Sequence, residues 1–177
     1  VVTPCDYDQT YKAVKKCVEY EKPFYIRFYR DKTPNFTGMD AKFEFGKADL
    51  LIDGTDVTLI ANGLLVWEAI IATENLKKDG ISARVVNMHT IKPIDVDMIV
   101  KCAKDTGLVI TCEDHQKQSG LYGAVAEVLS LHYPTQMDYV AVEDTFGESG
   151  TMQQLMSKYK IDHVEIERKV KARLKSK

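Results

Sequence analysis

Three consecutive residues that could exchange protons or bind a cation, Glu113, Asp114 and His115, follow an apolar and β-branched run at 109–112. Carboxylates and imidazoles are common general acids and bases, and both can coordinate metal ions. Consecutive residues at a strand end point in different directions, so three adjacent side chains rarely meet one ion. No second cluster of His, Cys or acidic residues with ligand-like spacing lies nearby. We therefore interpret the three residues as structural and expect neither a metal site nor a catalytic residue in this chain.

Two glycines, Gly120 and Gly123, lie near the start of an expected helix. Backbone N–H groups at a helix N-terminus can bind an anion. Alternatively, a glycine there can form a tight turn that lets the helix pack closely on a sheet. The pair Asn62-Gly63, at an earlier strand end, lacks the three spaced glycines of a dinucleotide site, so no cofactor-binding residue is expected.

The elements that would position these residues alternate regularly from residue 56 onward. Apolar runs of strand length are separated by segments with helical periodicity. The expected strands cover 57–61, 81–87, 108–112 and 137–142, and the expected helices cover 64–78, 95–104, 123–132, 151–159 and 162–174. This alternation predicts an α/β fold of three layers, α/β/α, with an open, mostly parallel sheet covered by helices on both faces.

The first 55 residues follow a different pattern. Asp6 is a candidate N-cap, with Gln9 as its capping-box partner, for a helix that Pro23 would end. Aromatic and β-branched residues predict a strand over 24–29. The following prolines and glycines predict a linker with room for a short hairpin. One helix and one strand cannot make a sheet domain, so we expect them to be the end of a larger domain.

Composition and charge exclude several classes of protein. The hydrophobic fraction of 45% and charged fraction of 28% are typical of a globular domain, and the net charge of -2 disfavours nucleic-acid or membrane partners. The basic stretch 168–177 lacks interleaved aromatic residues and predicts a solvated helix. The cysteines lack disulfide or zinc spacing, and no membrane span or signal segment is found, so we expect a cytoplasmic protein. The isolated His89, His132 and His163 are expected to be exposed or to cap helices.

Several short motifs together resemble the C-terminal region of the transketolase family. They occur in the family's order and extend over essentially the whole chain. The motifs are YIRFYR at 25–30, GKA at 46–48, GTDVTLIANG at 54–63, TIKPID at 90–95, EDH at 113–115 and GESG at 147–150. By this resemblance, residues 1–30 are the C-terminal end of the pyrimidine-binding domain, 31–55 a linker, and 56–177 the transketolase C-terminal domain.

The resemblance implies the C-terminal portion of a transketolase, which transfers a two-carbon ketol unit between sugar phosphates in the pentose phosphate pathway. Such enzymes are dimers that hold thiamine diphosphate and a divalent metal, Mg, in other domains. The family's Gly-Asp-Gly cofactor motif is missing, and its activating glutamate is expected upstream of Val1. We therefore expect no bound cofactor and no activity from this chain alone. Its expected partners are the remaining domains, or an N-terminal subunit, in a homodimer of the complete enzyme.

One site residue follows from the resemblance. Arg30 matches the arginine that contacts the phosphate of the sugar substrate, and the planar fork of a guanidinium suits phosphate oxygens. The period of a strand places Arg27 and Arg30 on opposite faces, so Arg27 is expected to pair with an acid at the domain junction. The family places Glu113, Asp114 and His115 in a loop at a domain or subunit junction.

The chain departs from the family at Ser119 and Tyr122, where relatives have glycine. A group that approaches this turn in relatives would be excluded here or held differently.

Other functions stay open. Deoxyxylulose phosphate synthases and the β subunits of 2-oxo acid dehydrogenases share the domain. From a different class, a free α/β domain could act as a non-catalytic regulatory or binding module.

Overall fold

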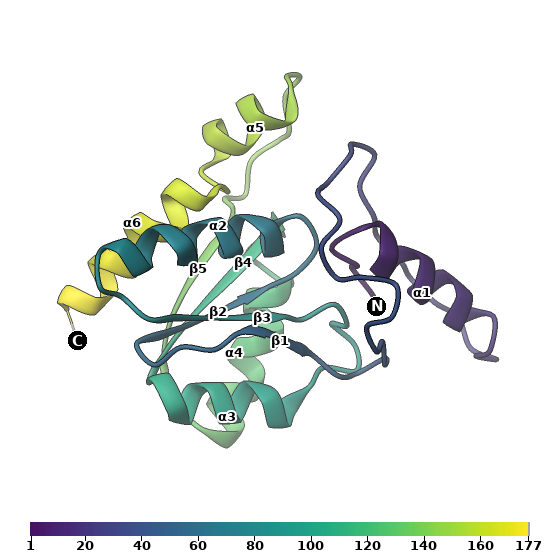
Figure 1. The fold of residues 1–177 in the computed structure, drawn as a ribbon, viewed down its shortest axis with the longest axis horizontal. Coiled ribbons are helices and arrows are strands. Elements are labelled where there is room, and N and C mark those ends of the chain that lie inside the picture. The colour runs from purple at the N-terminus through teal and green to yellow at the C-terminus, as the bar shows by residue number, and fades with distance from the viewer. Residues whose placement is uncertain (177) are drawn as a thin grey trace.

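Five strands form the central sheet of the computed structural model, which describes residues 1–176. They are β1 (Asp49–Ile52), β2 (Val57–Ala61), β3 (Ala83–Asn87), β4 (Leu108–Gln116) and β5 (Gln136–Val142). Their order is β1-β3-β2-β4-β5 (Figure 1). β2, β3, β4 and β5 are parallel, and β1 is antiparallel to β3. The mostly parallel sheet predicted from the sequence is therefore confirmed.

Helices cover both faces of this sheet, as predicted (Figure 1). The helices are α2 (Leu65–Lys78) and α6 (His163–Lys175) on one face, and α3 (Val96–Thr106) and α4 (Leu121–His132) on the other. Successive side chains of a strand point to opposite faces, so β2 contributes to both cores. Leu59 packs in the core with α2 and α6, and Ile60 packs in the core with α3 and α4. A further helix, α5 (Met152–Tyr159), precedes α6.

Local sequence signals fix the helix ends. Asp95 caps α3, because its carboxylate accepts a hydrogen bond from the N–H of Met98 at 3.1 Å. Gly107 ends that helix with a left-handed φ of 66°. Thr151 and Gln154 form a capping box at the start of α5. The side chains of Asp95 and Thr151 accept hydrogen bonds from backbone N–H groups that a helix start leaves unpaired. Gly107 adopts the left-handed conformation in which the chain can pair the last carbonyl groups of the helix.

β1 lies inside the stretch that the sequence predicts to be a linker. It pairs with β3 through Asp49 opposite Asn87 and Leu50 opposite Val86. A four-residue strand is too short to show a period. An antiparallel edge strand also needs no crossover helix. The alternation of strands and helices, from which the other strands were predicted, therefore does not indicate β1.

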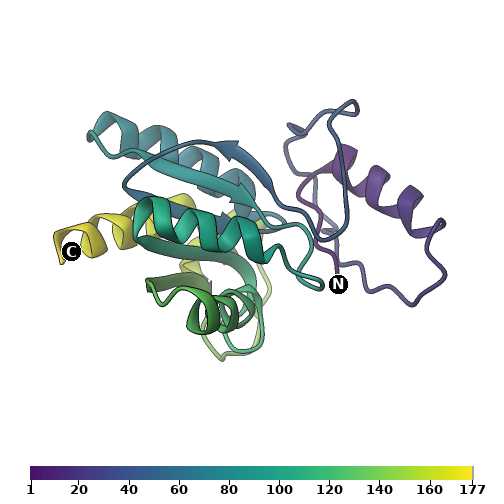
Figure 2. The same cartoon turned by 90° about the horizontal axis from the view of Figure 1, so that it is seen from below.

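Helix α1 (Tyr7–Cys17) lies beside the sheet (Figure 2). The Asp6 carboxylate caps it, accepting from the N–H of Gln9 at 2.8 Å. The Gln9 side chain accepts from the N–H of Cys5 at 3.0 Å, one residue earlier than a capping box requires. The apolar side chains at helical spacing are exposed to solvent, and they are Tyr7, Tyr11, Val14 and Val18.

The prediction of a strand over 24–29 is wrong. The segment forms only an isolated bridge between Ile26 and Val2. The N–H of Val2 donates to the carbonyl of Tyr25, and the N–H of Arg27 donates to the carbonyl of Val2, both at 2.9 Å. A strand needs a neighbouring strand that pairs with it along its length. Within the described residues, this segment pairs with Val2 alone.

Candidate functional site

The strand order defines where a ligand would be expected. The chain leaves β2 toward β3 and leaves β4 toward β5, so these neighbouring strands send their connections in opposite directions. In open α/β sheets, the crevice at the carboxyl ends of such a pair is the usual ligand site. Asn62 and Gly63 follow β2, while Glu113 and Asp114 lie in the C-terminal half of β4. We call the space between these strand ends the switch-point crevice.

Asp114 binds the N-terminal segment. Its Oδ1 accepts hydrogen bonds from Arg27 Nη2 and from Tyr29 Oη, each at 2.8 Å. Its backbone carbonyl accepts from Arg27 Nη1 at 3.2 Å. The side chains of the ion pair are only 25% and 17% exposed, so water screens their attraction less than at an open surface. Side chains therefore join the segment 24–30 to the end of β4.

Tyr29 fills the switch-point crevice above Gly63. A Cβ at Gly63 would lie within 2.7 Å of Tyr29 Cζ and 2.9 Å of Thr3 Cγ2. Burial raises the pKa of Tyr29, and the carboxylate of Asp114 raises it further, so the hydroxyl stays protonated and can donate. The Tyr29 ring thus takes up space in this crevice that a small molecule would otherwise occupy.

Glu113 takes the place of a bound anion at the start of α4. Its carboxylate accepts from the N–H groups of Leu121 at 2.7 Å and Tyr122 at 2.9 Å. Burial raises the pKa of Glu113, and the two N–H donors oppose that increase. A Cβ at Gly120 would come within 2.6 Å of the carbonyl oxygen of Gln116 and 2.8 Å of Glu113 Cδ. The glycine thus forms a tight turn, and the anion that it admits is the chain's own carboxylate.

The other residues noted in this region lie nearer the surface. His115 is exposed, with Nδ1 at 3.1 Å from the carbonyl oxygen of Gln116. Ser119 has a φ of 59°, in the left-handed region that favours glycine, and this fits the glycine that the family resemblance implies there. The Tyr122 ring packs on Tyr139 of β5, with ring centroids 5.0 Å apart.

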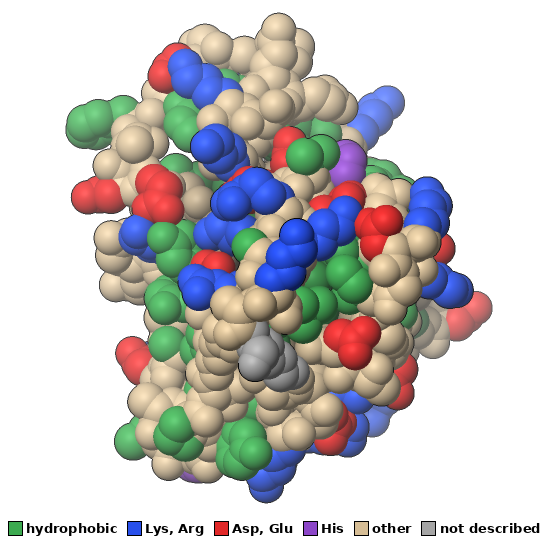
Figure 3. All heavy atoms as spheres, turned by 90° about the vertical axis from the view of Figure 1, so that its left-hand side faces the viewer, with side chains coloured by type: hydrophobic (Ala, Val, Ile, Leu, Met, Phe, Trp, Pro, Cys, Tyr) green, Lys and Arg blue, Asp and Glu red, His purple; other side chains and the backbone are tan. Residues whose placement is uncertain are grey.

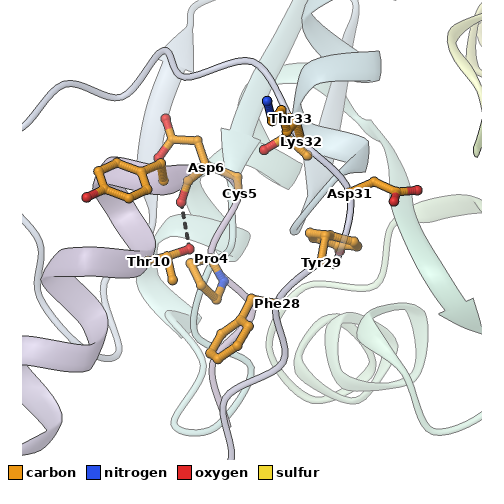
Figure 4. A pocket seen from close by; sticks show the side chains of 10 residues that line it. Pro4, Cys5, Asp6, Thr10, Phe28, Tyr29, Asp31, Lys32 and Thr33 are labelled. Carbon is orange, nitrogen blue, oxygen red and sulfur yellow. Dashed lines mark hydrogen bonds between the residues drawn. The ribbon is translucent and has the colours of Figure 1, made fainter.

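Arg30 extends into solvent. Its side chain is 97% exposed and forms a 3.8 Å ion pair with Asp31. Its neighbours in sequence, Tyr29 and Asp31, line a pocket of about 330 Å³ between the start of α1 and the segment 28–33 (Figure 4). Pro4 and Phe28 also line this pocket. The structure thus leaves the guanidinium accessible, and its role toward a phosphate stays a prediction.

A second buried polar cluster, which sequence reasoning missed, joins α1 to the sheet. The expectation that His89 is exposed or caps a helix is wrong, because it is fully buried. Its Nδ1 lies 2.9 Å from Thr90 Oγ1, and its Nε2 lies 3.8 Å from Asp49 Oδ2 without a hydrogen-bond partner. Asn87 Nδ2 donates to Gln9 Oε1 at 3.2 Å and to Asp49 Oδ2 at 3.3 Å. The position of His89 just after an apolar strand was the one signal that could have indicated burial.

Lowering the pH from 7 to 5 is expected to destabilise the fold by about 2 kcal/mol through His89. The pKa of His89 is lowered to about 4, chiefly by burial and also by nearby Lys12, while Asp95 opposes the decrease. The unfolded value is about 6.5, so the unfolded chain binds the proton first. The contribution is therefore present above pH 6.5 and is lost as the pH falls toward 4. Asp49, whose pKa burial raises, should offset part of the loss near pH 4.

Urea unfolding at both pH values measures this difference. The variant His89→Gln keeps a polar side chain without the titration, so its stability should change by well under about 1 kcal/mol between the two pH values. An undiminished pH dependence in that variant would assign the effect to another group.

Most of the cations of α6 are paired with acids. Arg168 pairs with Glu165 at 2.6 Å, and Lys171 pairs with Asp79 at 2.7 Å. Arg173 contributes a further pair at 2.7 Å to a carboxylate of β5. Blue and red side chains accordingly lie side by side on this face (Figure 3). Such pairing is typical of a solvated surface helix.

The switch-point crevice, as the structure describes it, does not fit a cofactor of the thiamine diphosphate type, because Tyr29 lies in it. Within residues 1–176, no group of three His, Cys, Asp or Glu side chains is placed to hold a metal ion. The usual ligand crevice is filled by Tyr29. In the same range, no helix combines the length and the apolar character needed to cross a membrane.

Comparison with known proteins identifies one family. The family described as "Transketolase, C-terminal domain" matches residues 46–166. The chain is 40% identical to one subunit of an apulose-4-phosphate transketolase of Phocaeicola vulgatus, over 92% of this chain and 52% of that protein. It is also 40% identical to a putative transketolase C-terminal section of Methanocaldococcus jannaschii, over 99% of this chain and 55% of that protein. The chain therefore spans about half the length of the curated relatives it matches.

A solved structure described as "Split gene transketolase, inactive beta4 tetramer" has the same fold. Its TM-score is 0.95 at 42% identity, covering 98% of this chain and 57% of that one. 1-Deoxy-D-xylulose-5-phosphate synthases and β subunits of pyruvate dehydrogenase are more distant relatives, which match at lower identity or over less of the chain.

Proposed function

The chain belongs to the family of transketolase C-terminal domains, and from this premise we propose that it is the C-terminal portion of a thiamine-diphosphate-dependent transketolase. The complete enzyme would transfer a two-carbon ketol unit between sugar phosphates. The cofactor and its metal would be held by other domains, as the family resemblance implies. This portion would instead support the substrate site and the junction between domains.

The observation that carries this proposal is the filled switch-point crevice. Arg27 and Tyr29 occupy the place where an independent α/β domain would bind its ligand. The family resemblance assigns both residues to the neighbouring pyrimidine-binding domain. A crevice closed by such a segment supports a domain junction, and it disfavours a free regulatory or binding module.

The exposed apolar face of α1 supports a partner domain. Apolar side chains that gather on one exposed surface usually mark an interaction site. Tyr7, at the start of this helix, is 69% exposed, and Val18, at its C-cap, is 87% exposed. The proposed occupant is the rest of the pyrimidine-binding domain, whether it precedes this region in one polypeptide or belongs to a separate N-terminal subunit.

Arg30 would bind the phosphate of the sugar substrate. Its guanidinium is almost fully exposed, and its 3.8 Å contact with Asp31 leaves donors available. A charged, planar donor group of this kind suits a phosphate. One relative is named for a sugar phosphate, apulose-4-phosphate. A place in the pentose phosphate pathway, a homodimeric complete enzyme and a cytoplasmic location remain predictions.

Thermal denaturation of the purified chain tests this proposal against the binding module. We expect the melting temperature to rise when a polypeptide carrying the cofactor-binding domains is added, because a partner that binds only the native state stabilises it by mass action. Thiamine diphosphate with Mg²⁺, or a sugar phosphate, should leave the melting temperature unchanged. A rise of several degrees with a sugar phosphate alone would favour the binding module.

A further inference from the structure

We propose that Asp114 is a positioning residue for substrate binding, which acts by fixing the segment that carries Arg30. Asp114 belongs to the C-terminal domain and is not expected to touch substrate itself. Because Arg30 is assigned to the substrate phosphate under the proposed function, this role of Asp114 depends on that function.

The contacts run from Asp114 to the residue that precedes Arg30. Asp114 Oδ1 accepts from Tyr29 Oη and from Arg27 Nη2, each at 2.8 Å. The Tyr29 ring also lies against Gly63, where a Cβ would come within 2.7 Å of Cζ. Tyr29 is therefore held on two sides, by the end of β4 and by the turn after β2. Consecutive Cα atoms are about 3.8 Å apart, so holding Tyr29 restricts where Arg30 can lie.

Arg30 has few contacts of its own that could fix it. Its side chain is 97% exposed, and the ion pair with Asp31 is long, at 3.8 Å. On the N-terminal side, the nearest backbone hydrogen bonds of the segment are those of Tyr25 and Arg27 with Val2. On the C-terminal side, the next hydrogen bond joins the Asn35 side chain to α1. Between Arg27 and Asn35, Tyr29 makes the described hydrogen bond that ties the segment to the sheet.

Loosening this attachment should weaken the binding of a phosphate without changing the chemical step. A mobile segment must be ordered when the substrate binds, and ordering one long side chain costs enough to weaken binding about threefold to tenfold. The penalty applies only to substrates that carry the anionic group, because other parts of the substrate do not meet Arg30. The expected signature is therefore a change in KM that depends on the phosphate.

Steady-state kinetics of the complete enzyme, with its cofactor-binding domains present, test this role. The acceptor is an aldose phosphate, compared with the same aldose lacking the phosphate. Asp114→Ala removes the acceptor of both hydrogen bonds and is expected to raise KM for the phosphorylated acceptor about threefold to tenfold, with kcat changed less than about twofold. KM for the unphosphorylated acceptor should not change.

A double-mutant cycle with Arg30 separates the possible outcomes. Arg30→Ala should raise KM for the phosphorylated acceptor by about tenfold or more, and adding Asp114→Ala should then have little further effect. If Arg30→Ala leaves KM unchanged, the assignment of Arg30 and the role of Asp114 are both wrong. If Arg30→Ala raises KM while Asp114→Ala does not, or if the two effects simply add, the role of Asp114 alone is wrong.

Two further variants distinguish a positioning effect on KM from a general loss of stability. Tyr29→Phe removes the hydrogen bond to Asp114 and retains the ring that fills the crevice, so it should raise KM in the same phosphate-dependent way. Asp105→Ala is the matched control, because it breaks a 2.8 Å ion pair with the buried Arg84 away from the crevice. This control should leave both KM values unchanged, and a phosphate-dependent increase in it would contradict a role specific to Asp114.

Discussion

Replacing Gly63 with alanine is expected to lower the free energy of unfolding by about 2–4 kcal/mol and to release Tyr29 from the switch-point crevice. Gly63 has a φ of 52°, which costs an alanine about 1 kcal/mol or more. The new Cβ would also come within 2.7 Å of Tyr29 Cζ and 2.9 Å of Thr3 Cγ2. Tyr29 would have to move, and its hydrogen bond to Asp114 would be lost. Urea unfolding of the purified chain measures the loss.

Gly80→Ala is the matched control for this variant. Gly80 also has a positive φ, of 77°, but nothing lies within 4 Å of the Cβ position. The control therefore carries only the backbone cost, about 1 kcal/mol. Equal losses in the two variants would show that Tyr29 does not press on Gly63 as the structure indicates.

Replacing Glu113 with alanine is expected to lower the free energy of unfolding by about 2–3 kcal/mol. The N–H groups of Leu121 and Tyr122 would lose their acceptor at the start of α4. Buried donors without an acceptor are costly, and the loss of the negative charge also removes a favourable interaction with the helix dipole. Burial of the Glu113 carboxylate is itself unfavourable, as its raised pKa indicates. The alanine variant no longer buries this charge, and this limits the loss of stability.

Glu113→Gln provides the comparison, because its side chain oxygen can still accept from one of the two N–H groups. We expect its stability to lie between those of the parent chain and the alanine variant, as measured by urea unfolding. Amide exchange at Leu121 and Tyr122 should accelerate most in the alanine variant. A fully stable alanine variant would contradict a capping role for this carboxylate.

Much of the fold followed from sequence because its signals are local. Buried parallel strands are continuous apolar runs, as at 57–61, and the helices between them begin and end at recognisable residues such as Asp95 and Gly107. β1 escaped detection because an edge strand of four residues has no period to recognise. The strand over 24–29 was predicted from composition, but composition does not supply a neighbouring strand.

The site was harder to predict, because its contacts join residues far apart in the chain. The sequence indicated that Glu113 and Asp114 are structural, but not what they would contact. The Asp114 carboxylate meets Tyr29, 85 residues away, and the Glu113 carboxylate meets backbone N–H groups that have no sequence signature of their own. The burial of His89 depends in the same way on distant residues, namely Asp49 and Phe43. The ring centroids of Phe43 and His89 are 4.5 Å apart.

These contacts show which groups occupy the switch-point crevice. In an independent domain, the carboxyl ends of β2 and β4 would receive a ligand. Here they receive Arg27 and Tyr29, and the residue that follows Tyr29 is the proposed phosphate ligand. The sheet domain would thus act on a substrate that it does not itself bind.

The most direct measurement is ketol transfer between sugar phosphates, assayed with thiamine diphosphate and Mg²⁺ for this chain alone, for a polypeptide carrying the cofactor-binding domains alone, and for the two mixed. We expect turnover only in the mixture. Sustained turnover by the 177-residue chain with no other polypeptide present would contradict the account.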